Sequence, residues 1–359
     1  MKRSAFAAAL LTLAMFNSCK KDEQVNNGPV VNPATGIYVL SEGSFGGNNT
    51  TLGYYSIPNS SFTGNFFGQQ NPGQAGLGDT GNDMIIYGSK LYVVMNGTSQ
   101  VTVINASTGS LIRRIDFVDG ANPKSPRYAT AARGRVFVTS YDNTVSVIDT
   151  SSLSIVGSVT VGANPDGIAA TNNYLYVANS GSYNFPDVDS TVSVIDINTL
   201  TETRKITVGK NPNKIEVAPN GDVYVSCYGN FSSIPASISI IDGTTNTLRT
   251  TLGSGFAYSH VRISGELAYF YNNYGGSGTA KVYNTATNTV VRNEFITDGT
   301  AITTPYGINI DEQNGDVYIT DAKDYVSAGT VTCFSKEGVR KFSFSATPGV
   351  NPNKVLFNR

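Results

Sequence analysis

The sequence predicts an all-β fold, a seven-bladed β-propeller whose four-stranded blades close into a ring. Three observations lead to this prediction. The chain of 359 residues has 37 glycines and 20 tyrosines and is only 14% charged, a composition that favours pleated sheets over disorder. A short sequence motif, a tyrosine-valine pair or a close variant of it, recurs seven times. The two ends of the chain carry complementary parts of one repeat.

An export signal is predicted at the start of the chain. Lys2 and Arg3 precede an apolar run over residues 5–16, and Cys19 follows soon after. The run is too short for a stable membrane span, and the layout is typical of a signal peptide. Cys19 resembles the lipobox cysteine of bacterial lipoproteins, which implies that residues 1–18 are removed and that Cys19 is lipidated. A plain secretory signal with a chance cysteine is the alternative.

Residues 19–35 are predicted to form a flexible tether, because they are polar, contain Asn, Gly and Pro and show no period. Their start, "CKKDE", resembles the tag that sends some lipoproteins to the outer face of an outer membrane. We therefore expect an outer-membrane protein that is exposed at the cell surface and contacts the membrane through its lipid anchor only. A simple solvated tether, with the protein on the periplasmic face, is the alternative.

A tyrosine-valine pair, with conservative variation at either position, marks each predicted blade over residues 36–359. A loop and a second apolar run follow each pair, and a turn and a further strand follow most of those runs. Units of roughly 40–45 residues with four short strands are typical of propeller blades. The phrases resemble those of the YVTN or YncE-like propellers, which implies the fold and little about function. The seven pairs are Tyr38-Val39, Tyr92-Val93, Phe137-Val138, Tyr176-Val177, Tyr224-Val225, Tyr269-Phe270 and Tyr318-Ile319.

The two ends of the chain predict how the ring closes. The last residues, "VNPNKVLFNR", repeat the start of "KNPNKIEVAPNGDVYV", so they form an innermost strand without the rest of its blade. The first repeat, "GIYVLSEG", lacks an innermost strand. We therefore expect the C-terminal strand to pair with the first blade.

Asn-Pro pairs and aspartates are predicted to shape the turns. Proline fixes φ and donates no hydrogen bond, so each Asn-Pro pair suits the turn that enters a new innermost strand. The aspartates that close the second apolar run are expected to accept hydrogen bonds from the next turn. The pairs are Asn122-Pro123, Asn164-Pro165, Asn211-Pro212 and Asn351-Pro352, and the aspartates are Asp149, Asp196 and Asp242.

A binding face is predicted where the loops between the second and third strands meet the connections between blades. These segments combine tyrosine with Ser, Gly and Asn, the mixture that antibody paratopes use. Loops on a rigid scaffold often carry function. Packing of a single ring beneath its own loop is the alternative for each. The aromatic candidates are Phe45, Tyr128, Tyr141, Tyr183, Phe185, Tyr228, Phe231, Tyr258, Tyr274, Tyr306 and Tyr325.

The first and last repeats resemble the surface lipoprotein propellers that capture cobalamin (vitamin B12) and work with a TonB-dependent outer-membrane transporter. Glu42-Gly43 and the loop with Asp321, Ala322, Asp324 and Tyr325 carry the likeness. The resemblance implies capture of a corrinoid for handover to a transporter. It makes Glu42, Asp321 and Asp324 further candidates for contact with the ligand.

The sequence predicts a binding protein and not an enzyme, without a cofactor or a bound metal. His260 is the only histidine, and no nucleophile motif accompanies it. The 25 basic residues, less Lys2 and Arg3, leave 23 against 26 acidic ones, so nucleic acid is not an expected partner. A scaffold or adhesion propeller that binds a protein or glycan is one alternative. A metal-dependent, lactonase-like hydrolase is another, although no ring of acids supports it.

Overall fold

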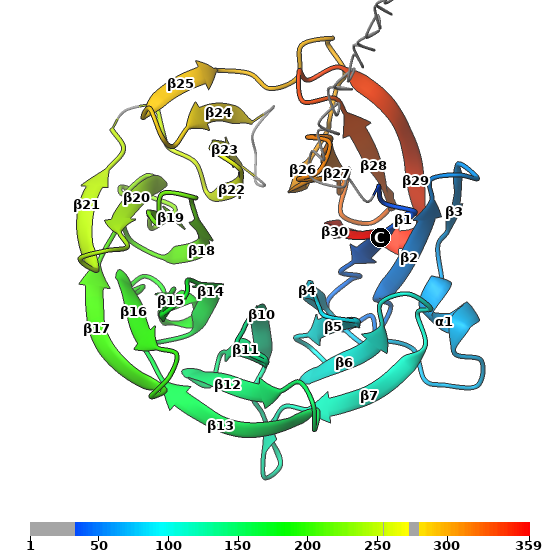
Figure 1. Cartoon of the computed structure of the whole chain (residues 1–359), viewed down its shortest axis with the longest axis horizontal. Helices are drawn as coiled ribbons and strands as arrows, with labels where there is room; N and C mark the ends of the chain where they lie inside the picture. The colour runs from blue at the N-terminus through cyan, green and yellow to red at the C-terminus, as the bar shows by residue number, and fades with distance from the viewer. Residues whose placement is uncertain (1–32, 254, 273–279) are drawn as a thin grey trace, which may run out of the picture. The chain divides into compact units, whose positions relative to one another are not determined.

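The computed structural model describes residues 33–253, 255–272 and 280–359. They form seven four-stranded antiparallel sheets that surround a central axis as the blades of a ring (Figure 1), so the prediction of a seven-bladed, all-β propeller is confirmed. Pro33–Arg359 form one compact unit. The predicted signal peptide, Cys19 and most of the predicted tether lie outside the described residues.

Each blade runs from an innermost strand at the axis to an outermost strand at the perimeter. Blade 1 joins β30 (Pro352–Asn358), β1 (Gly36–Ser41), β2 (Thr51–Ser56) and β3 (Ser61–Thr63). Blade 2 has β4 (Gly81–Tyr87), β5 (Lys90–Met95), β6 (Gln100–Asn105) and β7 (Leu111–Asp116). Blade 3 has β10 (Pro126–Ala132), β11 (Arg135–Ser140), β12 (Thr144–Asp149) and β13 (Ser154–Thr160).

The other four blades follow the same order. Blade 4 has β14 (Pro165–Ala170), β15 (Tyr174–Asn179), β16 (Thr191–Asp196) and β17 (Thr201–Thr207). Blade 5 has β18 (Pro212–Val217), β19 (Val223–Cys227), β20 (Ser237–Asp242) and β21 (Thr247–Thr251). Blade 6 has β22 (His260–Ser264), β23 (Leu267–Tyr271), β24 (Lys281–Asn284) and β25 (Thr289–Arg292). Blade 7 has β26 (Pro305–Ile310), β27 (Val317–Asp321), β28 (Ala328–Phe334) and β29 (Arg340–Val350).

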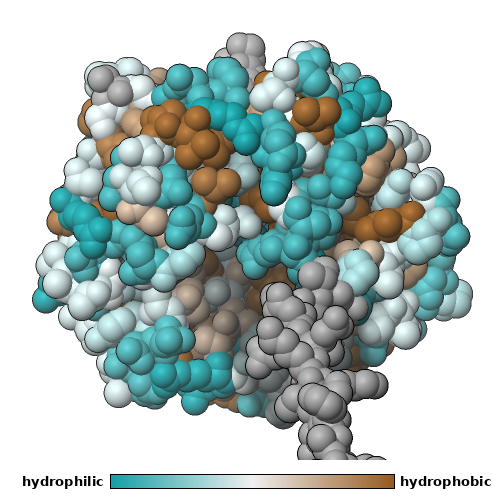
Figure 2. All heavy atoms as spheres, turned by 45° about the horizontal axis from the view of Figure 1, so that its top comes forward, coloured by the Kyte–Doolittle hydropathy of each residue, from teal (hydrophilic) through white to brown (hydrophobic). Residues whose placement is uncertain are grey.

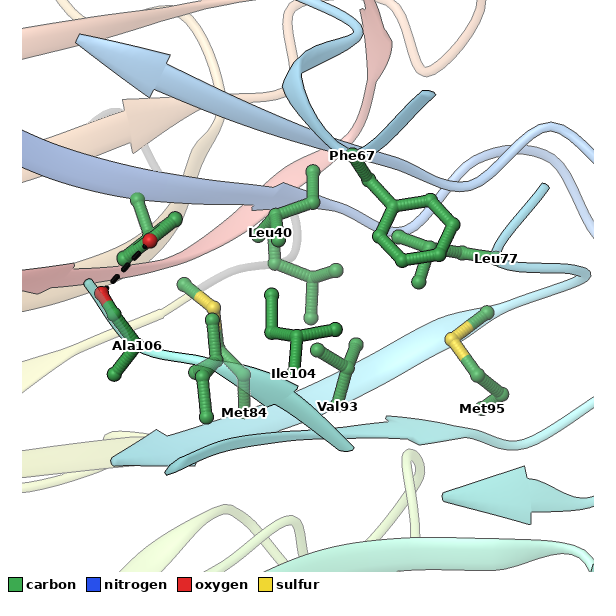
Figure 3. Packing of buried hydrophobic residues seen from close by; sticks show 11 residues of the cluster. Leu40, Phe67, Leu77, Met84, Val93, Met95, Ile104 and Ala106 are labelled. Carbon is green, nitrogen blue, oxygen red and sulfur yellow. Dashed lines mark hydrogen bonds between the residues drawn. The ribbon is translucent and has the colours of Figure 1, made fainter. Parts of the chain in front are cut away.

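The tyrosine-valine pairs form the core between blades. Side chains alternate across a strand, so Tyr38 packs toward blade 2 while Val39 packs toward blade 7. Both faces of β1 are therefore buried, which explains why the strand is an unbroken apolar run. Figure 3 shows the contact between blades 1 and 2, where Leu40 and Met84 belong to the same buried cluster as Phe67 of the short helix α1 (Phe66–Gln70).

The C-terminal strand closes the ring, as predicted. In blade 1, β30 pairs antiparallel with β1 and places Leu356 opposite Tyr38. The amide of Thr35 donates to the carbonyl of Asn358 at 2.8 Å, and the amide of Glu42 donates to the carbonyl of Asn351 at 2.9 Å. Hydrogen bonds thus join the two ends of the described unit along the whole of β1.

Three of the four Asn-Pro predictions are confirmed. Asn164, Asn211 and Asn351 have φ values of 44°, 55° and 54°, and the proline after each begins an innermost strand. The left-handed conformation suits asparagine because its short side chain can hydrogen-bond locally.

The prediction for Asn122-Pro123 is wrong. This pair forms β9 (Asn122–Pro123), which pairs with β8 (Val118–Asp119) in a small exposed hairpin between blades 2 and 3. The hairpin lengthens the connection, so the innermost strand begins later. Pro126 begins it, after Ser125 with a φ of 53°.

The aspartates that close the third strands shape the turns, as predicted. Asp149 accepts hydrogen bonds from the amides of Ser151 and Ser152 at 3.0 and 2.7 Å. Asp196 and Asp242 each accept hydrogen bonds from the backbone amides of the residues two and three positions later. Cys227 and Cys333 are buried free cysteines.

Candidate functional site

A cavity of about 610 Å³ lies at the centre of the ring, and residues from the innermost strands of all seven blades line it. Figure 2 shows the hollow in the molecular surface. We call this cavity the channel. Its walls follow directly from the repeat, because each blade contributes the same strand positions to it.

The strand register defines a ring of seven equivalent residues in the channel. In each blade, the first residue of the tyrosine-valine motif pairs with a residue of the innermost strand. The channel residue lies on that innermost strand, two positions before the paired residue. In blade order they are Lys354, Asp83, Tyr128, Gly167, Lys214, His260 and Gly307, and all of them line the channel. The repeat therefore fixes the backbone here, whereas the side chains differ from blade to blade.

The two glycines of this ring are required by close packing of the innermost strands. A Cβ atom on Gly167 would lie 2.4 Å from the carbonyl oxygen of Asn213 in the next blade, and one on Gly307 would lie 2.2 Å from that of Asn353. Backbone atoms cannot yield as a flexible side chain does. At these two positions the adjoining blade approaches closely and leaves no room for a side chain.

Four basic residues line the channel, and three of them form ion pairs between neighbouring blades. Arg127 Nε lies 2.7 Å from Asp166, Arg262 lies 2.9 Å from Glu216, and Lys354 Nζ lies 2.5 Å from Asp83. Buried charges are stable only when they are paired. These three pairs therefore hold blades 3 and 4, 5 and 6, and 1 and 2 together.

Lys214 is the fourth basic residue of the channel, and it lies within ion-pair distance of no carboxylate among the described residues. Its Nζ sits 3.6 Å from the ring centroid of Tyr128, a cation–π contact. Burial lowers the pKa of Lys214 to about 8, because the charged form loses hydration.

Glu42 lies at the same channel and accepts a hydrogen bond from the hydroxyl of Tyr306 at 2.6 Å. Burial raises the pKa of Glu42, and the Tyr306 hydrogen bond opposes that shift. The two predicted site residues Glu42 and Tyr306 thus meet in one contact between blades 1 and 7.

His260 is buried against two rings of the channel wall. Its centroid lies 5.7 Å from that of Tyr228 and 5.0 Å from that of Tyr271. Nδ1 lies 3.0 Å from Ser259 Oγ. Burial, with the charge of Lys214, holds the pKa of His260 well below its usual value, so the neutral imidazole is the folded form.

Replacing His260 with Gln should make the free energy of unfolding less sensitive to acid. The neutral, buried imidazole takes up a proton on unfolding below about pH 6.5, so its contribution falls by up to about 1.4 kcal/mol per pH unit below that value. Glu42 acts oppositely, since its raised pKa costs stability as the pH rises, and the substitution leaves that effect in place. Urea unfolding of both proteins near neutral and near acid pH measures the difference. Equal pH dependence would contradict a buried neutral His260.

A second cavity of about 190 Å³ adjoins the channel and shares Arg127, Tyr128, Lys214 and Tyr228 with it. Five predicted aromatic residues from blades 3, 4 and 5 line this cavity, and we call them the aromatic mouth. They are Tyr128, Tyr141, Phe185, Tyr228 and Phe231.

The aromatic mouth combines tilted ring-to-ring contacts with exposed apolar surface. Phe231 lies 5.6 Å from Tyr228 and 6.4 Å from Phe185, centroid to centroid. The guanidinium of Arg127 lies 4.7 Å from the Tyr141 centroid. Phe185 and Phe231 are 56% and 69% exposed. Large apolar side chains gathered at the rim of a cavity make the mouth the candidate binding surface of the described structure.

The other predicted site residues lie elsewhere on the described part of the ring. Tyr183 packs edge-on against Tyr141 beside the mouth, with centroids 4.9 Å apart. Tyr325 packs edge-on against Tyr306 at 6.0 Å. Tyr258 packs against Phe270, between blades 5 and 6.

Phe45 and the two predicted aspartates do not reach the cavities. Phe45 is 87% exposed and lines neither of them. Asp321 is buried and accepts backbone hydrogen bonds from Thr303, Thr304 and Lys323, which fixes the entry to β26. Asp324 accepts hydrogen bonds from the amides of the two residues that end its own loop. Tyr274 lies outside the described residues.

Sequence reasoning missed the basic residues of the channel. The predicted site residues were chosen from loops and from connections between blades. The basic residues lie instead in innermost strands, and they are Arg127, Lys214, Arg262 and Lys354. Tyr128 and Tyr306 were predicted as residues of connections between blades, and they lie within the innermost strands β10 and β26. Aligning the seven innermost strands on their tyrosine-valine partners would have revealed the ring of channel positions.

Within the described ranges, no cluster of three or more His, Cys, Asp or Glu side chains has the arrangement of metal ligands. Over the same residues, no helix has the length and apolar character needed to cross a bilayer.

The chain belongs to the family described as "Domain of unknown function (DUF5074)", whose model matches residues 35–355. No curated protein matches the chain. The fold is similar to that of a quinoprotein alcohol dehydrogenase-like protein from Bacteroides thetaiotaomicron, with a TM-score of 0.64 and 17% identity over 91% of this chain and 79% of that one.

Two further solved structures share the fold. Hydrazine synthase from Kuenenia stuttgartiensis matches with a TM-score of 0.57 and 19% identity over 70% of this chain and 74% of that one. The computationally designed Ika8 protein matches with a TM-score of 0.56 and 12% identity over 88% and 89%. At these identities the likeness shows the propeller fold alone.

Proposed function

We propose that this chain is a binding protein that captures a bulky nutrient at its aromatic mouth. The observation that carries the proposal is the gathering of exposed rings, above all Phe185 and Phe231, at the rim of a polar channel. These side chains lie on loops whose ends are held by the strands of the blades, which limits how much of the protein binding must order. Phe231 and Tyr228 supply apolar and stacking contact.

The ligand that we propose is a corrinoid, for handover to an outer-membrane transporter. The resemblance of the first and last repeats to cobalamin-capturing lipoproteins motivates this choice, together with the predicted lipid anchor at Cys19. A wide, partly apolar ligand with polar edges suits a mouth of aromatic rings above a polar channel. The protein would hold the ligand without chemical change.

Calorimetric titration of the purified full chain with cyanocobalamin, and separately with cobinamide, tests the ligand. We expect saturable binding at micromolar ligand or below. Phe231→Ala should weaken it at least tenfold, because truncation of a central aromatic contact costs on the order of 2 kcal/mol. Phe45→Ala is the matched control, since this exposed ring lies outside both cavities, and it should bind as the unaltered chain does. No heat or spectral change with either corrinoid would remove the corrinoid proposal.

The same preparation tests the alternatives. A stable protein or glycan partner captured from outer-membrane extract, independent of Phe231, would favour the scaffold function. Hydrolysis of lactones that depends on an added divalent metal would favour the hydrolase.

A further inference from the structure

Lys214 and Asn213 are adjacent residues of β18 where the aromatic mouth meets the channel. Lys214 lines both cavities, and Asn213 lines the smaller one. The three other basic residues of the channel each have a carboxylate within 3 Å, as described above, whereas Lys214 forms no ion pair with any residue that the structure describes, and its Nζ lies 3.6 Å from the ring centroid of Tyr128. The positive charge of Lys214 is therefore the one that a ligand can neutralise.

Asn213 provides an independent observation at the same place. The residue is 2% exposed, and its Nδ2 has no hydrogen-bond partner within the described structure. Its Oδ1 accepts a hydrogen bond from Ser226 Oγ at 3.0 Å, which leaves Nδ2 as the unsatisfied donor of the amide. A buried N–H without an acceptor is unfavourable. An acceptor that arrives with a ligand would remove that cost.

We propose that Lys214 and Asn213 form a subsite for an oxyanion group, a carboxylate or a phosphate, at the base of the aromatic mouth. The Lys214 ammonium supplies the charge, and the Asn213 amide supplies a directed hydrogen bond. This subsite deepens the proposed function, because it adds an anionic group to the chemistry of the captured ligand. Its own test needs no corrinoid.

The charged and titratable groups around Lys214 come from every strand packed against it. They are Glu42, Asp83, Arg127, Tyr128, Asp166, Glu216 and His260. Asp83, Asp166 and Glu216 are already paired with other cations, and Glu42 accepts from Tyr306. Lys214 itself is thus the group whose protonation controls the affinity of the subsite for an anion.

Calorimetric titration of the full chain with sulfate and with acetate tests the subsite. Sulfate represents a phosphate-type group without changing its own charge near neutral pH, and acetate represents a carboxylate, so the tighter of the two identifies the source of the oxyanion. We expect one saturable site. Because the pKa of Lys214 is about 8, affinity should fall about tenfold from about pH 7 to about pH 9. This measurement uses the unaltered protein and does not depend on a variant that folds.

Lys214→Met and Asn213→Asp should each weaken sulfate binding at least tenfold. The first removes the charge, and the second replaces the free donor by a carboxylate that would itself pair with Lys214. Lys205→Met is the matched control, because Lys205 lies on the outermost strand of blade 4 with its side chain 45% exposed. Absence of a saturable site for either anion, or affinity that Lys214→Met leaves unchanged, would overturn the subsite. Sulfate binding through Lys214 without corrinoid binding would instead remove the corrinoid and leave the subsite.

Discussion

A chain truncated after Asn351 should fail to fold cooperatively. The truncation removes β30, which supplies the innermost strand of blade 1, the buried side chain of Val355 and the cation that pairs with Asp83. The edge of β1 and the wall of the channel would then face water. Since domains are stable by only about 5–15 kcal/mol, we expect the loss to consume most of that margin. Circular dichroism during heating should show no sharp transition.

A rearranged chain supplies the control for this truncation. Residues 352–358 can be moved ahead of Gly36, because the ends already meet where Thr35 donates to Asn358. A short linker then makes blade 1 an ordinary antiparallel succession of four strands. We expect cooperative melting to return. A truncated chain that melts like the intact one would show that ring closure by β30 does not stabilise the fold.

Lys354→Met should lower the free energy of unfolding by about 3–5 kcal/mol, because it leaves Asp83 charged and unpaired. The Asp83 side chain is 2% exposed and that of Lys354 is 24% exposed. The carboxylate of Asp83 also accepts the amide of Ala129 at 3.0 Å, so one group joins blades 1, 2 and 3. Urea unfolding measures the effect.

Two further variants isolate the cause of that loss. Lys205→Met removes a cation that lies 3.7 Å from Glu202 at the perimeter, and it should cost no more than about 1 kcal/mol. Asp83→Asn in the Lys354→Met background removes the unpaired charge but keeps an oxygen for Ala129, so it should restore part of the stability. A double variant no more stable than Lys354→Met would contradict a charge-based explanation.

The fold was predictable because the repeated motif lies in the strands that form the core between blades. Tyr38 and Val39 face different neighbouring blades, so both must be apolar, and the same requirement recurs around the ring. The terminal strand was recognisable because Asn351-Pro352 repeats the entry to β18. Asn122-Pro123 misled because an inserted hairpin carries the same dipeptide. A local turn signal does not state which strand follows it.

The site was predictable only in part. Tyr141, Phe185, Tyr228 and Phe231 stand out as loop aromatics, and the structure gathers them at one cavity. The role of Lys214 and Arg127 could not be predicted, because a single charged residue within a strand does not indicate which residues of other strands will surround it. Their importance arises when seven distant strands are brought around one axis. Asp321 was predicted to contact the ligand, but its carboxylate accepts hydrogen bonds from the backbone amides that precede β26.

A crystal structure of the full chain grown with cyanocobalamin tests the central claim most directly, namely that the aromatic mouth captures the ligand. We expect the ligand to contact Tyr228 and Phe231, with a polar group directed toward Lys214. A ligand bound at the perimeter of the blades, or on the opposite face of the ring, would contradict the claim.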